Sequence, residues 1–276
     1  MIGWLIYSAV DVEKNKYYIQ MYKDKFKEHF IEIKLVIVEE LENMEQYVKC
    51  NKVDFAINRS RNHIMGELLE QKGVRVFNSS SVTRIANNKG ITYEFLKDVV
   101  PFLAVKYGNE IIESKIENKG FEYPYVIKSC SGHGGSQVFL VNNRKEEEQA
   151  VKAMNGQEYV VQQCCSDLGR DVRVYIIGNK IIKAVLRTST ESFKSNYSLG
   201  GKVQEYTLNN EEKAMVERIV DKLPLDYAGI DFTFHNGKAV FNEIEDAVGA
   251  RMLYQVSDID IAEMYIKYIL EKLSKE

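Results

Sequence analysis

Three acidic side chains near the end of the chain have the spacing from which a metal site can be built. Asp231, Glu243 and Glu245 lie on two predicted strands within AGIDFTFHNGKAVFNEIEDAVGAR, residues 228–251. Three carboxylates on one patch repel one another unless a cation neutralises them. Oxygen ligands suit a hard divalent cation, so magnesium carried with a nucleotide would neutralise the acids. The alternative is a solvated hairpin face, the common fate of strand acids, and the hairpin alone does not decide for the metal.

The turn between the two strands decides whether the acids share a face. A two-residue Asn-Gly turn would set Asp231 opposite Asn242 and drive the other two acids into the apolar face, since successive strand side chains alternate. A three-residue loop with Gly237 left-handed shifts the register by one. We therefore predict the three-residue loop, with Phe241 on the side of the acids. The buried face it predicts consists of Ile230, Phe232, Phe234, Val240 and Ile244.

Composition restricts the class of protein. A chain of 276 residues holds one large or two to three small units with a real core, and a net charge of −3 gives no electrostatic support for a nucleic-acid partner. No apolar run approaches the length of a membrane span, and the start lacks the pattern of a signal peptide. The four cysteines have no zinc-type spacing and read as reduced thiols, so a cytoplasmic location is expected.

Residues 1–80 alternate short apolar runs with amphipathic stretches, which predicts a parallel sheet with crossover helices. No GxGxxG follows the first strand, so a dinucleotide site is not expected. Arg59 and Arg61 come directly after the third predicted strand, where α/β folds place ligand contacts. They either face a substrate anion or are solvent-exposed residues at a helix start.

Two lysines and a glycine-rich turn follow. Residues 78–101 read as helix, break, helix, and Lys89 sits in the break. In YVIKSCSGHGGSQVFLV two apolar strands flank GHGG, and Lys128 projects from the first strand. Gly132, Gly134 and Gly135 allow backbone N–H groups to approach an anion, although such turns are often just flexible.

The second half contains charged strands and one long loop. In DVRVYII, Asp171 and Arg173 lie on one face, and Arg187 occupies a similar position on the return strand. These charges either form a cross-strand salt bridge or serve a site. Residues 191–208 read as a long polar loop, and helices are predicted at 210–223 and around 261–269.

The order of these pieces resembles the ATP-grasp superfamily, and most closely its RimK-type glutamate ligases. The motifs are IANNKG, YVIKSCSGHGGSQV, VVQQCC, GRDVRVYIIGNKI, SFKSN, AGIDF and FNEIE, over roughly residues 78–265. The resemblance implies an α/β and α+β protein, with a Rossmann-like pre-ATP-grasp domain followed by a two-subdomain ATP-grasp fold. The implied boundaries are 1–80 for the first domain, 81–163 for the small subdomain with its phosphate flap, and 164–276 for the C-terminal subdomain.

The resemblance also implies contacts to ATP. Lys89 and Lys128 would contact phosphates, and the adenine edge would meet Gln163 and Cys164, with Asp171 at the ribose. The flap over the phosphates corresponds to Gly132, His133, Gly134, Gly135 and Ser136, and the loop over the triphosphate to Lys194, Ser195 and Asn196.

The metal and catalytic positions follow in the same way. Magnesium, one or two ions, with manganese as a substitute, would be bound by Asp231, Glu243 and Glu245; Arg173 and Arg187 would face the phosphates or an acyl intermediate. The family usually has an asparagine where this chain has Glu245. Arg251 either clamps a substrate carboxylate or pairs with Glu245 or Asp246.

The implied activity is an ATP-dependent ligase that joins a small-molecule or peptide carboxylate to an amine through an acyl phosphate. A kinase-like ATP-grasp enzyme and a nucleotide-binding module without turnover are the alternatives. No nucleic-acid or membrane partner is expected. A homodimer is a habit of the family, and the sequence does not fix the oligomeric state or the substrates.

Overall fold

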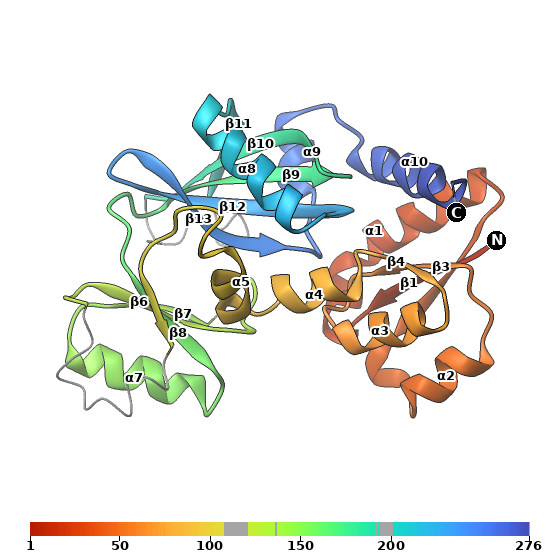
Figure 1. The fold of residues 1–276 in the computed structure, drawn as a ribbon, viewed down its shortest axis with the longest axis horizontal. Coiled ribbons are helices and arrows are strands. Elements are labelled where there is room, and N and C mark those ends of the chain that lie inside the picture. Colours follow the sequence, from red (N-terminus) through yellow and green to blue (C-terminus); the bar gives the residue numbers. More distant parts are fainter. Residues whose placement is uncertain (108–120, 136, 191–192, 194–200, 276) are drawn as a thin grey trace.

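The computed structural model describes residues 1–107, 121–135, 137–190, 193 and 201–275. The strands of these residues form three sheets, and Figure 1 shows each sheet with its own helices. Ser136, Lys194, Ser195 and Asn196, predicted at the nucleotide, lie outside the described residues. No helix of the described part is long and apolar enough to cross a membrane.

The N-terminal sheet is parallel, as the alternation in the sequence predicts, and its four strands have the order β2-β1-β3-β4. Its strands are β1 (Ile2–Tyr7), β2 (Glu32–Ile37), β3 (Phe55–Asn58) and β4 (Arg75–Phe77). The connections are α1 (Ala9–Glu28), the short 3-10 helix η1 (Val38–Glu40), α2 (Met44–Cys50) and α3 (His63–Gln71). Alternate residues of β1 enter two different cores, Trp4 with α2 and α3, and Leu5 with α1. The sheet is therefore buried on both faces, which explains its continuous apolar runs.

Residues 170–245 contain the strands of a five-stranded antiparallel sheet, in the order β11-β10-β9-β12-β13. The strands are β9 (Arg170–Ile177), β10 (Lys180–Thr188), β11 (Lys202–Tyr206), β12 (Tyr227–His235) and β13 (Lys238–Glu245), and α8 (Asn210–Lys222) packs on the sheet. The prediction of a loop throughout 191–208 is wrong for β11, because its backbone pairs with the edge of β10. Pairing with a distant strand overrides the polar local sequence.

A smaller antiparallel sheet, β5-β8-β6-β7, carries the glycine-rich turn. It comprises β5 (Val105–Tyr107), β6 (Tyr125–Ser129), β7 (Val138–Val141) and β8 (Tyr159–Gln163), and α7 (Arg144–Met154) covers one face. The GHGG segment joins β6 to β7, as predicted.

Four further helices tie the sheets together. Helices α4 (Ser80–Ala86) and α5 (Lys89–Leu96) confirm the predicted helix, break, helix, and both pack in the core of the five-stranded sheet. Helix α9 (Arg251–Val256), which the sequence did not predict, and α10 (Ile261–Leu273) close the chain. Figure 1 shows α10 beside α1, and the two helices share the core under the N-terminal sheet. The described end of the chain therefore packs on its beginning.

The β12–β13 hairpin corrects the predicted turn. His235 pairs with Lys238, so the turn has two residues, Asn236 and Gly237, with φ of 51° and 74°. Positive φ at both positions is what an Asn-Gly turn of type I′ requires. The three-residue loop is therefore wrong.

A β-bulge supplies the odd residue instead. Asp231 pairs with Glu243 while Phe232 pairs with Phe241, which leaves Asn242 as the extra residue. Phe241 is fully buried on the apolar face, contrary to the prediction, and the half-buried Val240 faces away from it. Residues directly opposite in an antiparallel pair share a face, so Asp231 and Glu243 do lie on one side.

Candidate active site

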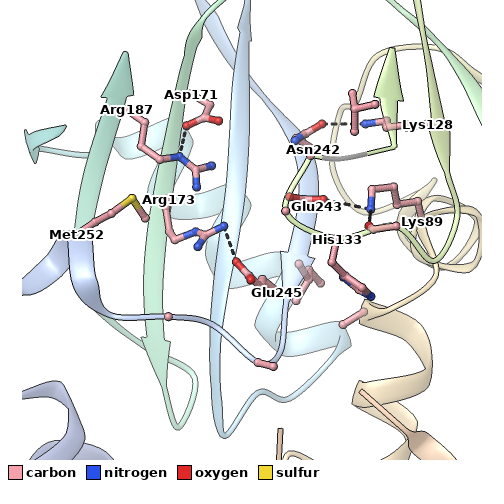
Figure 2. Close-up of a pocket in the computed structure, with 18 of the residues that line it drawn as sticks. Lys89, Lys128, His133, Asp171, Arg173, Arg187, Asn242, Glu243, Glu245 and Met252 are labelled. Atoms are coloured by element: carbon pink, nitrogen blue, oxygen red, sulfur yellow. Dashed lines mark hydrogen bonds and ion pairs between the residues drawn. The ribbon is translucent and has the colours of Figure 1, made fainter. Parts of the chain in front are cut away.

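A cavity of about 520 Å³ lies where all three sheets meet. Its lining includes Tyr7, Asp11 and Arg61 from the N-terminal sheet and its helices, together with residues of the glycine loop and of the five-stranded sheet. Figure 2 shows Lys89, Lys128 and His133 on one side of this cavity and the arginines of β9 and β10 on the other, with Glu243 and Glu245 between them. This volume suits a small-molecule ligand.

Both predicted phosphate lysines reach the cavity. Lys89 is the first residue of α5, and its Nζ donates to the carbonyl of Gly132 at 2.7 Å and lies 3.4 Å from Glu243. Lys128 projects from β6, and its Nζ donates to the Tyr93 hydroxyl at 2.9 Å and to Asn242 Oδ1 at 3.0 Å. Burial lowers the pKa of Lys128 to about 8. Two ammonium groups thus face the cavity from one side. The charge of Lys89 is partly neutralised by Glu243, whereas both hydrogen-bond partners of Lys128 are neutral.

The glycine loop lines the same wall. Gly134 and Gly135 have φ of 64° and 77°, the left-handed region that glycine adopts without strain. Gly132 and His133 also line the cavity. Burial, and then the positive charges of Arg61 and Lys89, lower the pKa of His133 to about 4. The loop therefore presents a neutral imidazole and exposed backbone at the cavity at neutral pH.

A buried cluster of charges occupies the opposite wall. The Asp231 carboxylate, which has no exposed surface, accepts from Arg173 Nε and a terminal Arg173 nitrogen at 2.8 and 2.7 Å and from Arg187 at 2.7 Å. Arg173 also contacts Glu245 at 2.6 Å, and Arg187 donates to Asp171. Burial alone would raise the pKa of Asp231, but the two guanidinium groups lower it to about 2. The predicted cross-strand charge pairing is present, and it lies inside the site.

The carboxylates fit a divalent cation only in part. Among the described residues no three His, Cys, Asp or Glu side chains are grouped in a way that suits a metal ion. Both oxygens of Asp231 are taken by guanidinium groups, whereas the side chains of Glu243 and Glu245 are 33% and 28% exposed in the cavity wall. Glu243 and Glu245 are therefore the donors best placed for magnesium, and the assignment of all three acids to metal stays a prediction.

Two of the three residues predicted at the adenine and the ribose lie in the cavity wall, and their contacts to a nucleotide stay a prediction. Gln163 and Asp171 line the cavity. At the end of β8 the described lining includes Cys165 and not Cys164. A hydrogen bond from the Cys164 thiol is the main cause that lowers the pKa of Cys165 to about 6. A strand that ends at Gln163 no longer alternates, so parity could not tell which thiol faces inward.

The three remaining arginines have separate roles. Arg59 is buried, not solvent-exposed: it donates to the Tyr7 hydroxyl at 2.9 Å and to the carbonyls of Ala247 and Val248 at 3.1 and 2.8 Å. It joins the N-terminal sheet to the segment after β13.

Arg61 and Arg251 reach the cavity itself. Arg61 lines it while paired with Asp11. Arg251 is exposed at the start of α9, and no ion pair is found for it within the described ranges. Glu245 is held by Arg173, and Asp246 is buried against Asn87. The alternative in which Arg251 pairs with either acid is therefore not found.

Sequence reasoning missed two polar residues that bind Lys128, namely Asn242 in the cavity wall and Tyr93 behind it. Neither residue is among the site residues that the sequence predicts. Their one sequence signal is position, since Tyr93 follows Lys89 by one helical turn and Asn242 precedes Glu243.

The fold and the cavity together define an ATP-grasp protein, in which a small antiparallel sheet with a glycine loop faces a larger sheet that carries acids and arginines. The model of the RimK-like ATP-grasp domain matches residues 94–269. The chain belongs to this family.

Relatives and a solved structure agree with the family. An uncharacterized protein of Mycoplasma genitalium is 32% identical over 269 residues, which cover 96% of this chain and 91% of the relative. A probable alpha-L-glutamate ligase of Vibrio vulnificus is 28% identical over 244 residues, 87% of this chain and 72% of the relative. The ATP-grasp ligase PsnB, complexed with a phosphomimetic variant of its minimal precursor, Mg and ADP, has the same fold at 14% identity, with a TM-score of 0.70 over 97% of each chain.

Proposed function

We propose that this protein is an ATP- and magnesium-dependent ligase that joins a carboxylate to an amine through an acyl-phosphate intermediate. One observation carries the proposal: the ammonium groups of Lys89 and Lys128 face the cavity opposite the guanidinium groups of Arg173 and Arg187, with Glu243 between them. Such an arrangement can bind a polyanion and neutralise charge that develops on it. Relatives named as glutamate ligases support the reaction class.

The proposed contacts follow from the geometry of the cavity. Lys89, Lys128 and the backbone of the glycine loop hold the ATP phosphates, and Gln163 with Cys165 borders the base. Asp171 lies on the nucleotide side of the arginine cluster. Glu243 and Glu245 hold magnesium, and the bound ion would supply positive charge to the phosphates. Asp231 keeps Arg173 and Arg187 in place.

Two bond-forming steps complete the proposed reaction. A substrate carboxylate oxygen attacks the γ-phosphorus, the bond to the β-bridging oxygen breaks, and ADP leaves. An amine then attacks the acyl carbon, the carbon–oxygen bond to phosphate breaks, and the amine loses a proton. Arg173 and Arg187 stabilise the negative charge in both steps, so no protein nucleophile is needed.

The acid and the amine are proposed to enter from the side of the N-terminal sheet. Residues of α1, Arg61 and Arg251 line that part of the cavity. The exposed Arg251 guanidinium can bind a substrate carboxylate in bidentate fashion. We assign 1–80 to the pre-ATP-grasp domain, 81–163 to the small subdomain and 164–276 to the C-terminal subdomain.

The test is ADP release with a panel of carboxylic acids, each with and without amines and with and without Mg²⁺. Release that needs both an acid and an amine, with an amide found by mass spectrometry, is the expected result. A phosphorylated product without an amine would replace ligation with phosphoryl transfer. ATP binding with no turnover across the panel would indicate a nucleotide-binding module.

A further inference from the structure

Tyr93 lies behind the proposed phosphate lysine, at the junction of four elements. Its ring is 3% exposed and packs against Phe102 and Phe241, with ring centroids 5.0 and 6.2 Å away. Its hydroxyl is bonded to Lys128 of β6 at 2.9 Å, Gln162 of β8 at 3.1 Å and the main-chain carbonyl of Asn242 in β13 at 2.8 Å. One hydroxyl on α5 thus touches two of the three β-sheets that meet at the cavity.

The direction of each of these hydrogen bonds is fixed by chemistry. The Lys128 ammonium and the Gln162 amide nitrogen can only donate, and the Asn242 carbonyl can only accept. The single Tyr93 proton must therefore go to Asn242, and both lone pairs of the phenol oxygen are used. Burial raises the pKa of Tyr93, so the proton stays in place at neutral pH.

Asn242 is the extra residue of the β-bulge, and both of its oxygens take part. Its Oδ1 accepts from Lys128 at 3.0 Å, and its main-chain oxygen accepts from Tyr93. The next residue is Glu243, which the bulge turns toward Lys89 and the cavity. A bulge leaves a residue without its ladder partner, so these two bonds hold it.

The partners of Lys128 matter for its charge. Both are neutral, so they fix the ammonium without cancelling its charge, whereas a direct carboxylate partner would compete with an anionic ligand. Lys128 and Glu243 are thereby positioned by one shared pair of side chains, although they belong to different sheets.

We infer that Tyr93 and Asn242 are positioning residues that couple the phosphate lysine Lys128 to the metal-side carboxylate Glu243. This inference rests on the proposed function, because it concerns how the same site binds ATP and magnesium together. Neither residue touches the ligand in this role. Loss of the Tyr93 hydroxyl should therefore weaken ATP binding and also raise the Mg²⁺ concentration that this binding requires.

The first experiment measures ATP binding to the full chain by titration calorimetry, in the presence of Mg²⁺. Tyr93→Phe keeps the ring packing and should lower the affinity for ATP about tenfold, which is the effect of losing one hydrogen bond to a charged group. Tyr206→Phe is the matched control, since its hydroxyl bonds to Glu212 away from the cavity, and it should bind ATP as the natural chain does. The Mg²⁺ concentration for half-maximal binding should rise in Tyr93→Phe alone.

A double-mutant cycle separates positioning from general damage. If Tyr93 acts through Lys128, Tyr93→Phe should cost little further ATP affinity in a Lys128→Met background. Asn242→Ala, which keeps the main-chain oxygen, should weaken ATP and show the same lack of additivity.

Two results would overturn the inference alone: unchanged ATP and Mg²⁺ binding in Tyr93→Phe, or additive losses in the cycle. If the natural chain binds no ATP, the proposed function fails, and the coupling fails with it.

Discussion

Replacing Asp231 with asparagine separates two roles that its position allows. The change keeps the shape of the side chain and removes the negative charge between Arg173 and Arg187. If Asp231 holds the arginines, the variant should lose stability with or without a metal ion. If Asp231 is a metal ligand first, the loss should depend on magnesium.

The magnitude follows from the contacts. The pKa of Asp231 falls from an ordinary 3.8 to about 2, which corresponds to about 2 kcal/mol of net stabilisation of the carboxylate, after the guanidinium groups have offset the cost of burial. The asparagine oxygen can replace one carboxylate oxygen only, so one buried N–H of Arg173 would face an amide N–H, at a cost of about 1–3 kcal/mol. The two costs together should lower the free energy of unfolding of Asp231→Asn by about 3–5 kcal/mol, the usual cost of breaking a buried ion pair.

The assay is thermal unfolding followed by circular dichroism, in EDTA and in Mg²⁺. A chain of this size should lose about 6–20 °C in Tm, at about 2–4 °C per kcal/mol. Because the folded-state pKa is depressed, the contribution of Asp231 is complete above 3.8 and is lost only as pH falls through about 2. The difference in Tm between the natural chain and Asp231→Asn should therefore be constant from about pH 5 to 8.

The exposed Asp221 on α8 offers a matched control, and Asp221→Asn should stay within about 0.5 kcal/mol of the natural chain. A loss below about 1 kcal/mol for Asp231→Asn would refute the estimate, since it would mean that the buried pairs contribute little. A loss that appears only with Mg²⁺ would move Asp231 from the arginine cluster to the metal.

Three other substitutions and one pH profile test the site. Glu243→Gln should reduce Mg²⁺-dependent ADP release about a hundredfold or more. Its Tm should change by no more than about 2 °C, because this side chain is a third exposed and the Lys89 ammonium lies 3.4 Å away. Retained turnover would show that Glu243 is not a metal ligand. Lys128→Met should raise KM for ATP about ten- to hundredfold through loss of a charged phosphate donor, and a Tm loss without a change in KM would make the lysine structural. In the natural chain, kcat/KM for ATP should fall about tenfold per pH unit above about 8, as the ammonium with its pKa of about 8 loses its proton, and a flat profile up to pH 10 would contradict this. Arg251→Ala should raise KM for the carboxylic acid and leave KM for ATP and Tm unchanged, and the reverse pattern, measured by the same ADP assay, would place Arg251 at the nucleotide.

Much of the fold could be predicted because the local pattern and the tertiary structure agree. The apolar runs before residue 80 gave a parallel sheet, and the Asn88 cap places Lys89 at the start of α5. Failures occurred where a distant partner decides, as with β11, whose polar sequence forms a strand only because β10 presents an open edge. Short α9 carries no long apolar stripe and shows no side-chain cap bond.

The candidate site shows the same division. Alternation placed Asp171, Arg173 and Arg187 on one face, and the structure pairs Arg187 with Asp171 and both arginines with Asp231. Clustered acids need positive charge nearby, but either a metal ion or a guanidinium group can supply it. Guanidinium groups 44 and 58 positions away satisfy Asp231, which a strand pattern cannot reveal.

The sequence by itself determined that an apolar face and an acidic face must coexist on the last hairpin, because side chains along a strand alternate between its two faces. It could not determine how the odd residue is absorbed, since a longer loop and a bulge both place Glu243 and Glu245 on the side of Asp231 and differ only for residues nearer the turn, such as Val240 and Phe241. Only the tertiary structure decided for the bulge at Asn242, because the bonds that hold it come from Tyr93 and Lys128, 149 and 114 positions away along the chain.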